Sequence, residues 1–348
     1  PSAAASDVYK RQEYLIGTLE INDPLAVVVA QDPRVRHDLF ITDGHTGGAH
    51  DGDVVLARIT SYPDRRQPMQ GYVVEVLGAA DAPGMDVDII IHNLDLPTKF
   101  SPQALEQAEG IEVDVEAALA EPGRHDLRMR DIFTIDPTDA KDFDDAISLD
   151  EVDGMLRLGV HIADVSSYVA WDSHIDICAR DRATSVYLVD RVLPMLPEKL
   201  SNDVCSLRPG EDRLTMTCDM YLDASANVRR YEIYPSVICS KRRFDYDEVQ
   251  DILDGKRDDP YAAKLARFDA LAKRLLSLRL ARGAIDFETV EAKPVLDERG
   301  MVMRVDLRHK TDATSMIEEA MILANETVAR HAHANDCLLY TSPSPRDR

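Results

Sequence analysis

The chain has 348 residues, 45% of them hydrophobic, which is enough for one large core or two of moderate size. Its 63 acidic and 40 basic residues give a formal net charge of −23, which excludes a protein that holds nucleic acid over its whole surface, so a polyanion needs a local basic channel. There is no long apolar run, no signal-peptide core, and five cysteines without a CxxC pair, so we expect a cytoplasmic, non-membrane protein with free thiols.

The first predicted elements lie between residues 13 and 78. Short β-prone runs separated by Gly, Asp or Pro predict a small β-barrel of the OB kind, with an SH3-like barrel as the alternative. These runs cover residues 15–19, 26–30, 38–41, 54–59 and 72–77. Residues 1–12 and 337–348, at the two ends, lack periodicity and look non-native, so neither tail enters the fold prediction.

The rest of the chain predicts an α+β body. Residues 79–130 are more polar and read as a connector that leads into this body, with helices at 102–109 and 113–120. From residue 131 to 336, strands are expected at 132–135, 146–149, 155–160 and 214–221, and helices at 174–182, 262–282 and 314–331. The last helix has an apolar stripe of helical period that predicts a core-facing side, made of Ile317, Ala320, Met321, Ala324 and Val328.

Five aspartates crowd the connection between the first two strands of this body: Asp136, Asp139, Asp142, Asp144 and Asp145. Two carboxylates about 4 Å apart repel by roughly 4 kcal/mol at an effective dielectric near 20, so convergence requires protonation or bound cations. An EF-hand is excluded, because Lys141 or Ile147 stands where that loop needs glycine. Carboxylate oxygens then favour Mg²⁺ or Mn²⁺, and with them phosphodiester cleavage; a solvated acidic turn is the alternative.

Several motifs in a fixed order now resemble one known family. They are DFDDA at 142–146, GVHIADVS at 159–166, TSVYL at 184–188, LSN at 200–202, CSL at 205–207 and EEAMILAN at 318–325. The series resembles the catalytic (RNB) domain of the ribonuclease II and ribonuclease R family, closer to ribonuclease R, and covers nearly all of residues 13–335. The resemblance implies a cold-shock barrel of the OB type at 13–78 followed by an RNB domain at 131–336.

The resemblance also implies an activity: a processive 3′→5′ exoribonuclease that hydrolyses single-stranded RNA with Mg²⁺ and releases nucleoside 5′-monophosphates. Mn²⁺ is the alternative ion on the chemistry of the carboxylate ligands. Four aspartates match the family's catalytic and metal-binding positions, namely Asp136, Asp142, Asp144 and Asp145. Asp139 is expected to be an exposed turn residue. Two metal ions about 3.5–4 Å apart suit this reaction, because one activates water and the other stabilises the leaving oxygen. We expect a monomer.

Candidate substrate-binding residues follow from the same resemblance. Tyr187 matches the tyrosine that stacks on the 3′-terminal base, and Phe287 is a candidate for its partner; stacking contributes about 1–3 kcal/mol per base. His161 is expected either near RNA or as a satisfied core histidine. Ser201, Asn202 and Ser206 are either donors to phosphate or ribose, or turn formers. Candidate channel cations, with ion pairing inside the protein as the alternative, are Arg180, Arg182, Arg191, Lys199, Arg208 and residues 241–243.

The chain departs from the family at its end. The family's catalytic domain continues past the Glu318–Glu319 helix to an arginine motif and then an S1 domain, and this sequence stops at that helix. We therefore expect a fragment with weak or no turnover, because loss of a charged transition-state stabiliser costs several kcal/mol. An RNA-binding fragment without catalysis is the main alternative. A DNA-directed nuclease is a weaker one, since discrimination would depend on contacts to the 2′-hydroxyl.

Overall fold

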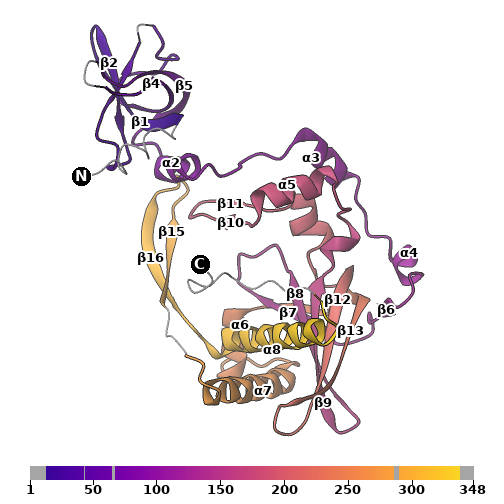
Figure 1. The fold of residues 1–348 in the computed structure, drawn as a ribbon. Helices are drawn as coiled ribbons and strands as arrows, with labels where there is room; N and C mark the ends of the chain where they lie inside the picture. Colours follow the sequence, from indigo (N-terminus) through magenta and orange to yellow (C-terminus); the bar gives the residue numbers. More distant parts are fainter. Residues whose placement is uncertain (1–12, 43, 65–66, 286–289, 338–348) are drawn as a thin grey trace. The chain divides into compact units, whose positions relative to one another are not determined.

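The computed structural model of the protein describes residues 13–42, 44–64, 67–285 and 290–337. These residues form two compact units, which are described separately (Figure 1). Of the described residues, the first unit contains those up to residue 99 together with segments 186–193 and 292–306. The second unit contains those at 100–185, 194–285, 290–291 and 307–337. The sequence did not reveal that two segments from within the predicted catalytic domain group with the barrel.

The first unit is built on a closed five-stranded barrel, as predicted. Its strands are β1 (Tyr14–Asn22), β2 (Leu25–Ala30), β3 (Leu39–Ile41), β4 (Asp53–Ser61) and β5 (Gln70–Ala79), and they close in the order β1-β2-β3-β5-β4. Alternate residues such as Leu19, Val28 and Val55 fill the interior and are fully buried. Gly17 is required on β1, because a Cβ there would lie 2.1 Å from the carbonyl oxygen of Val29 on β2.

A helix that the sequence analysis did not predict follows the barrel. Helix α2 (Met85–Asn93) lies in the polar connector and packs Met85 against Ile16 and Val54 of the barrel. Its residues Val87 and Ile91 pack against Leu193 of β11 (Val192–Leu193), which pairs with β10 (Val186–Tyr187). Part of the predicted connector therefore folds as a helix that belongs to the first unit.

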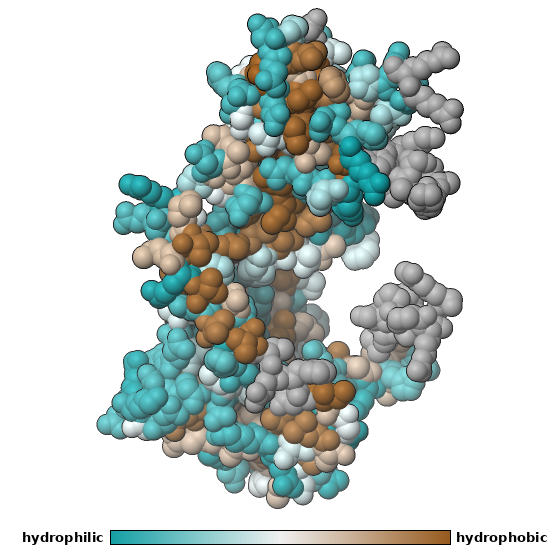
Figure 2. Space-filling view, turned by 90° about the vertical axis from the view of Figure 1, so that its left-hand side faces the viewer, coloured by the Kyte–Doolittle hydropathy of each residue, from teal (hydrophilic) through white to brown (hydrophobic). Residues whose placement is uncertain are grey.

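The first unit also receives most of a two-stranded sheet, β15 (Val290–Leu296) and β16 (Val302–His309). Alternate residues around β16 are apolar and more than half exposed: Met301, Met303, Val305 and Leu307. Figure 2 faces the side of the molecule on which this hairpin lies and shows apolar side chains gathered along it. Two strands alone have little hydrophobic support, so this hairpin lacks a core of its own.

The second unit is built on a seven-stranded sheet of order β14-β7-β8-β9-β12-β13-β6. Five central strands run antiparallel, and the edge strands β14 and β6 are parallel to their neighbours. The strands are β6 (His125–Asp126), β7 (Ile132–Asp136), β8 (Asp145–Val152), β9 (Met155–Ala163), β12 (Asp212–Leu222), β13 (Val228–Cys239) and β14 (Arg242–Asp245). The four strands predicted in this body are confirmed, and β6, β13 and β14 were missed.

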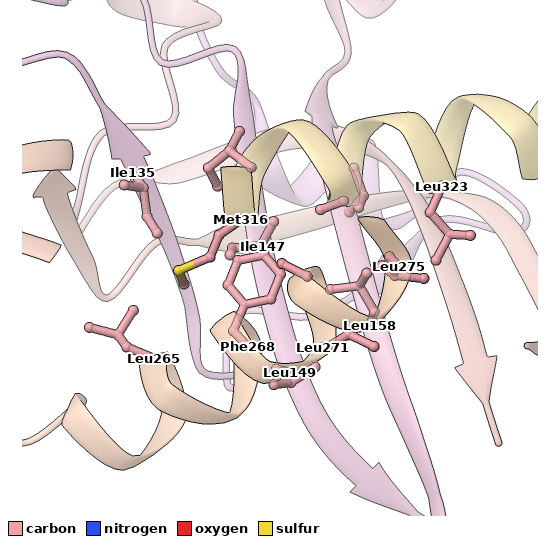
Figure 3. Close-up of a cluster of buried hydrophobic side chains, with 14 of the residues drawn as sticks. Ile135, Ile147, Leu149, Leu158, Leu265, Phe268, Leu271, Leu275, Met316 and Leu323 are labelled. Carbon is pink, nitrogen blue, oxygen red and sulfur yellow. The ribbon is translucent and has the colours of Figure 1, made fainter. Parts of the chain in front are cut away.

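Three helices cover the apolar face of this sheet: α6 (Tyr246–Leu253), α7 (Ala262–Ala281) and α8 (Asp312–Ala334). Figure 3 shows Phe268 of α7 and Met316 of α8 directed at Ile147 and neighbouring strand residues. Phe268, Met316 and Ile147 are all fully buried. This layer of helices on sheet forms the main core of the second unit.

Helix α8 bears out most of its predicted apolar stripe, with one correction. Ile317, Ala320 and Ala324 are buried, but Val328 is 43% exposed. The buried face instead ends at Thr327, one position earlier, because it follows residues 313, 316, 320, 323 and 327. The helix begins with a capping box between Thr311 and Thr314, two residues before the predicted start.

The opposite face of the sheet is covered by shorter elements: α3 (Pro102–Glu109), α5 (His174–Arg182) and the π-helix η2 (Leu200–Val204), which contribute Ala104, Ile175 and Leu200 to a second apolar cluster. Helix α4 (Val115–Leu119) packs beside β12 and β13. The helices predicted at 102–109 and 174–182 are confirmed at those bounds. Among the described residues, no helix is both long enough and apolar enough to span a membrane.

Candidate active site

The aspartate loop, which we define as residues 136–145, joins two paired strands of the second unit. Strands β7 and β8 pair through Ile132 with Ser148 and Phe133 with Ile147. Asp136 ends β7, and Asp145 begins β8. Because Pro137 has no backbone N–H to donate to a ladder, the regular pairing stops before it and the chain turns. The cluster is therefore a connection between two buried strands.

The five aspartates of the loop differ in burial. Asp136 is 8% exposed, Asp142 and Asp145 are half-buried, and Asp139 and Asp144 are exposed. Asp139 lies in a turn, as predicted for the one aspartate outside the catalytic set. The carboxyls of the other four lie within electrostatic range of one another, because Asp142 and Asp145 repel both Asp136 and Asp144. The four predicted metal-binding residues therefore lie close enough to influence one another's charge, although no three of them converge on one point.

Burial and mutual repulsion raise the pKa values in this group. Burial raises the pKa of Asp136 to about 7; repulsion from Asp145 and Asp142 adds to the rise, and Arg243 opposes it. Desolvation, with repulsion from Asp142 and Asp145, raises the pKa of Asp144 to about 6. Asp144 is exposed, so water screens its charge more than it screens that of the buried Asp136. Burial also raises the pKa of Asp145.

The donor set suits a hard divalent cation. Oδ2 of Asp136 is buried and makes no hydrogen bond within the described residues. The nearby Thr134 hydroxyl lowers the pKa of Asp136, but Thr134 Oγ1 is likewise buried and makes no hydrogen bond within the described residues. In the described part of the chain no three acidic, histidine or cysteine side chains converge closely enough to hold an ion. Carboxylate oxygens are ligands for hard divalent cations, which complete their shells with water or phosphate.

Two polar side chains from other strands and loops hold the backbone of the aspartate loop. The hydroxyl of Ser206, which is fully buried, accepts a hydrogen bond from Phe143 N (3.1 Å) and donates to Lys141 O (2.7 Å). Nη2 of Arg243 donates to the carbonyls of Pro137 (2.7 Å) and Thr138 (2.9 Å). Ser206 was expected either to donate to phosphate or ribose or to form a turn, and Arg243 either to line the channel or to pair with a carboxylate of the protein. The structure shows both side chains bound to the backbone of the aspartate loop.

Of the two candidate stacking residues, the structure describes Tyr187. Tyr187 lies on β10 of the first unit, opposite Val192 on β11, and is 67% exposed. An exposed aromatic ring offers a face on which a base can stack. The four aspartates belong to the second unit. Phe287 lies outside the described residues.

His161 is a core histidine, which was one of the two alternatives. It is fully buried in the sheet, where Nε2 lies 3.1 Å from Ser148 Oγ and Nδ1 lies 2.8 Å from Thr217 Oγ1. Burial lowers its pKa to about 3, so the ring is neutral at physiological pH. Both ring nitrogens are occupied within the sheet, and His161 has no surface from which to contact RNA. We therefore omit it from the proposed site.

The remaining candidates make local contacts within the second unit. Arg182 donates to Pro194 O (3.2 Å) and lies 3.8 Å from the centre of the Phe100 ring. Ser201 and Asn202 lie half-buried in the π-helix η2, where Ser201 donates to Asn202 Oδ1 (3.3 Å). A π-helical turn often marks a functional site, but these contacts alone assign no role.

Most of the predicted channel cations form ion pairs with the protein's own carboxylates, which was the alternative considered for them. Lys199 and Arg208 both pair with Asp203, and the other pairs are Arg180–Asp172, Arg191–Asp190 and Arg242–Glu248. Of the aromatics beside the last of these, Phe244 is fully buried in the core and Tyr246 is half-buried. The expected basic channel is not visible as a set of unpaired cations within the described residues.

Comparison with known proteins decides the family. The RNB domain matches residues 124–347, and a cold-shock domain matches residues 28–101. The chain belongs to the RNB-domain family. The RNB match covers the aspartate loop, and it also extends over residues 337–347, within the tail that looks non-native by composition. The predicted combination of a cold-shock barrel and an RNB domain is confirmed.

Curated relatives in this family are named ribonuclease R. That of Thermotoga maritima is 42% identical over 323 residues, which cover 90% of this chain and 45% of the relative. That of Escherichia coli K12 is 39% identical over 323 residues, covering 91% of this chain and 40% of the relative. The chain thus spans less than half the length of these two relatives.

Solved structures of the family share the fold. Mycoplasma genitalium RNase R in complex with ribose-methylated single-stranded RNA has a TM-score of 0.88 and 28% identity, over 94% of this chain and 52% of that one. Its complex with double-stranded RNA has a TM-score of 0.89 and 29% identity, over 94% and 59% of the two chains. Yeast Ssd1, described as a pseudonuclease, matches at a TM-score of 0.67 and 19% identity over 93% and 41%. The fold alone therefore does not decide whether a chain is catalytic.

Proposed function

We propose that this chain carries the catalytic centre of a 3′→5′ exoribonuclease that hydrolyses single-stranded RNA with divalent metal ions and releases nucleoside 5′-monophosphates. The aspartate loop carries this proposal. Its four carboxyls lie within electrostatic range of one another, and Asp136 keeps a buried oxygen without a hydrogen bond. Membership of the RNB family and similarity to RNA-bound RNase R structures add support.

Each aspartate would act as a cation ligand in its charged form. Asp136, Asp142, Asp144 and Asp145 would hold the ions, with water and RNA phosphate completing the ligand shell. A bound divalent ion would supply an activated water and stabilise charge on the phosphate. Because the pKa values of Asp136 and Asp144 are about 7 and 6, cation binding must displace protons, and affinity should fall as the pH drops below about 7.

The proposed substrate contact is stacking on Tyr187. Its ring is exposed on a short hairpin, and stacking on an aromatic ring does not depend on base identity. Such a contact suits an enzyme that removes any terminal nucleotide. Phe287, Arg182, Ser201 and Asn202 remain candidates for further RNA contacts on the strength of the family motifs. We also propose Mg²⁺ as the working ion, with Mn²⁺ as a substitute, and a monomer as the working form.

A direct assay tests the proposal. Single-stranded RNA labelled at its 5′ end is incubated with the protein in Mg²⁺, in EDTA, and with Asp145→Asn in Mg²⁺. The proposal predicts a ladder that shortens from the 3′ end in Mg²⁺ alone, with nucleoside 5′-monophosphates as products. Cleavage in EDTA, or equal cleavage by Asp145→Asn, would show that the aspartate loop is not the catalytic centre.

The second candidate function is RNA binding without catalysis. It is favoured by the absence, among the described residues, of three acidic side chains arranged around one ion, and by the similar fold of a pseudonuclease. In that case RNA affinity would be salt-sensitive and unchanged in Asp145→Asn, and no ladder would form in either condition. The two functions therefore give opposite results in the same assay.

A further inference from the structure

The backbone of the aspartate loop is tied down at several points, although its side chains repel one another. Between Pro137 and Asp144, the carbonyl oxygens of residues 137, 138, 141, 143 and 144 all accept hydrogen bonds from groups other than the loop's own aspartates. The question is which contacts fix the carboxylates before any cation is present.

The first anchor is Ser206, which grips the loop on both sides of Phe143. Its hydroxyl accepts from Phe143 N and donates to Lys141 O, while Leu207 N donates to Phe143 O (2.9 Å). Phe143 is buried in the apolar cluster that also contains Leu207. Since Phe143 stands between Asp142 and Asp144, fixing its backbone and ring fixes the chain that carries both carboxylates.

Ser206 is itself held rigidly. Nε of Arg213, which is 5% exposed, donates to Ser206 O (2.9 Å). On the far side of Phe143, Ala163 N donates to Asp144 O (2.9 Å) from the end of β9. The Ser206 hydroxyl is the one side-chain group in this arrangement that both accepts from the loop and donates to it. Removing it leaves a buried N–H and a carbonyl without that partner, which is costly for a loop under repulsion.

The second anchor is Arg243, which holds the other end of the loop. Its Nη2 donates to the carbonyls of Pro137 and Thr138, directly after Asp136, and its guanidinium lies 5.5 Å from the centre of the Phe143 ring. Its charge also favours the ionised form of Asp136. The positive charge of Arg243 would repel a divalent cation. Its hydrogen bonds to Pro137 and Thr138, in contrast, would keep the loop in the conformation that binds one.

We propose that Ser206 and Arg243 are positioning residues that hold the aspartate loop in its cation-binding arrangement, with the loop carbonyls turned inward to them. This role rests on the proposed function and goes beyond it, because neither residue touches the cation or RNA in it. In many metalloproteins, loss of a group that orients a ligand weakens metal binding by about 10- to 100-fold.

The test measures Mn²⁺ binding to the full chain by the loss of the free-ion electron paramagnetic resonance signal. Only ions whose binding disappears in Asp145→Asn are counted, because an acidic protein also binds Mn²⁺ elsewhere. Ser206→Ala is compared with Ser236→Ala, a matched control: Ser236 is also fully buried, and its hydroxyl lies 2.6 Å from those of Thr215 and Thr217, away from the loop. Amide hydrogen exchange without metal reports the loop itself.

The proposal predicts that Ser206→Ala weakens this Mn²⁺ binding about 10- to 100-fold, while Ser236→Ala leaves it near the wild-type value. In the metal-free protein, the amides of Phe143, Ala163 and Leu207 should exchange faster in Ser206→Ala only. Arg243→Met should also weaken Mn²⁺ binding; tighter binding would show that Arg243 acts through its charge and would overturn its positioning role.

Two further outcomes separate this proposal from the proposed function. If Ser206→Ala binds Mn²⁺ like the wild type, or if Ser236→Ala weakens binding equally, the positioning role of Ser206 is wrong, whatever the RNA assay shows. If the wild-type chain binds Mn²⁺ and Ser206→Ala weakens that binding, but RNA is never cleaved, the positioning role stands and the proposed enzymatic function fails. If no Mn²⁺ binding of the wild type is lost in Asp145→Asn, both the positioning role and the proposed function are wrong.

Discussion

Replacement of Asp136 by asparagine should stabilise the metal-free protein, and more so as the pH rises. A pKa raised from 3.8 to about 7 means that holding this carboxylate charged in the fold costs about 4 kcal/mol. Below pH 4 both the folded and unfolded states keep the proton and the cost is absent. As the pH rises, the unfolded chain releases its proton first, so wild-type stability falls until the folded-state pKa is passed. Asparagine has no proton to release, and the variant avoids this loss.

The free-energy cost of the Asp136 charge can be separated from other effects of the substitution, because this cost depends on pH. The cost at pH 5 is about 1.5 kcal/mol and at pH 8 about 4 kcal/mol, so the advantage of Asp136→Asn should grow by about 2–3 kcal/mol between them. Any change in packing or hydrogen bonding by the amide is the same at both pH values. Saturating Mg²⁺ should stabilise the wild type more than the variant, because the variant lacks one charged ligand.

Urea unfolding in EDTA measures this difference. Circular dichroism follows the transition, since Trp171, the single tryptophan of the chain, is 82% exposed in the folded state and its fluorescence would change little on unfolding. Asp139→Asn is the matched control, since Asp139 is an exposed residue of the same loop. If the variant's stability relative to wild type were the same at pH 5 and pH 8, Asp136 would not carry the strain described here and would be a poor candidate for a cation ligand.

Three other predictions concern different parts of the molecule. Arg279→Met should lower the free energy of unfolding by about 3–5 kcal/mol, because it leaves the carboxylate of Glu319, which is 2% exposed, without its ion pair. Arg282→Met removes an exposed ion pair and should lower it by about 0–1 kcal/mol. Equal losses of the two variants in urea unfolding would contradict this prediction. Tyr187→Ala should weaken RNA binding by about 1–3 kcal/mol in a filter-binding assay, whereas Tyr187→Phe should bind RNA like the wild type. The Mn²⁺ affinity of Tyr187→Ala should stay near the wild-type value. Unchanged RNA affinity in Tyr187→Ala would exclude stacking on this residue. The ring signals of His161 should not titrate between pH 5 and 8 in NMR, since its pKa is about 3, and a midpoint in that range would mean that the ring is accessible.

Hydrophobic pattern was sufficient to predict much of the fold. The barrel strands, the helices at 102–109 and 174–182 and the long α7 and α8 have clear periodicity and end signals, such as Ser101 and Ser173 at the N-caps of α3 and α5. Strand β13 was missed because Arg229, Arg230 and Glu232 interrupt its apolar run; it is held by pairing with β12, which a local pattern does not reveal.

The candidate site was only partly predictable for a similar reason. The aspartates are adjacent in sequence, so their proximity in the fold follows from one loop. Ser206 and Arg243 reach that loop from positions more than 60 residues away, and their motifs gave no sign that they bond to backbone carbonyls. The partition of Tyr187 into the first unit likewise depends on packing between Leu193 and α2, which the sequence does not specify.

An anomalous difference map from crystals of the protein grown with Mn²⁺ and a short, uncleavable RNA would test the central claim most directly. The account predicts Mn²⁺ peaks within about 2.5 Å of carboxylate oxygens from the set Asp136, Asp142, Asp144 and Asp145, with RNA phosphate completing the ligand shell. Ordered RNA with no metal peak at the aspartate loop, or with its 3′ end bound elsewhere, would contradict it.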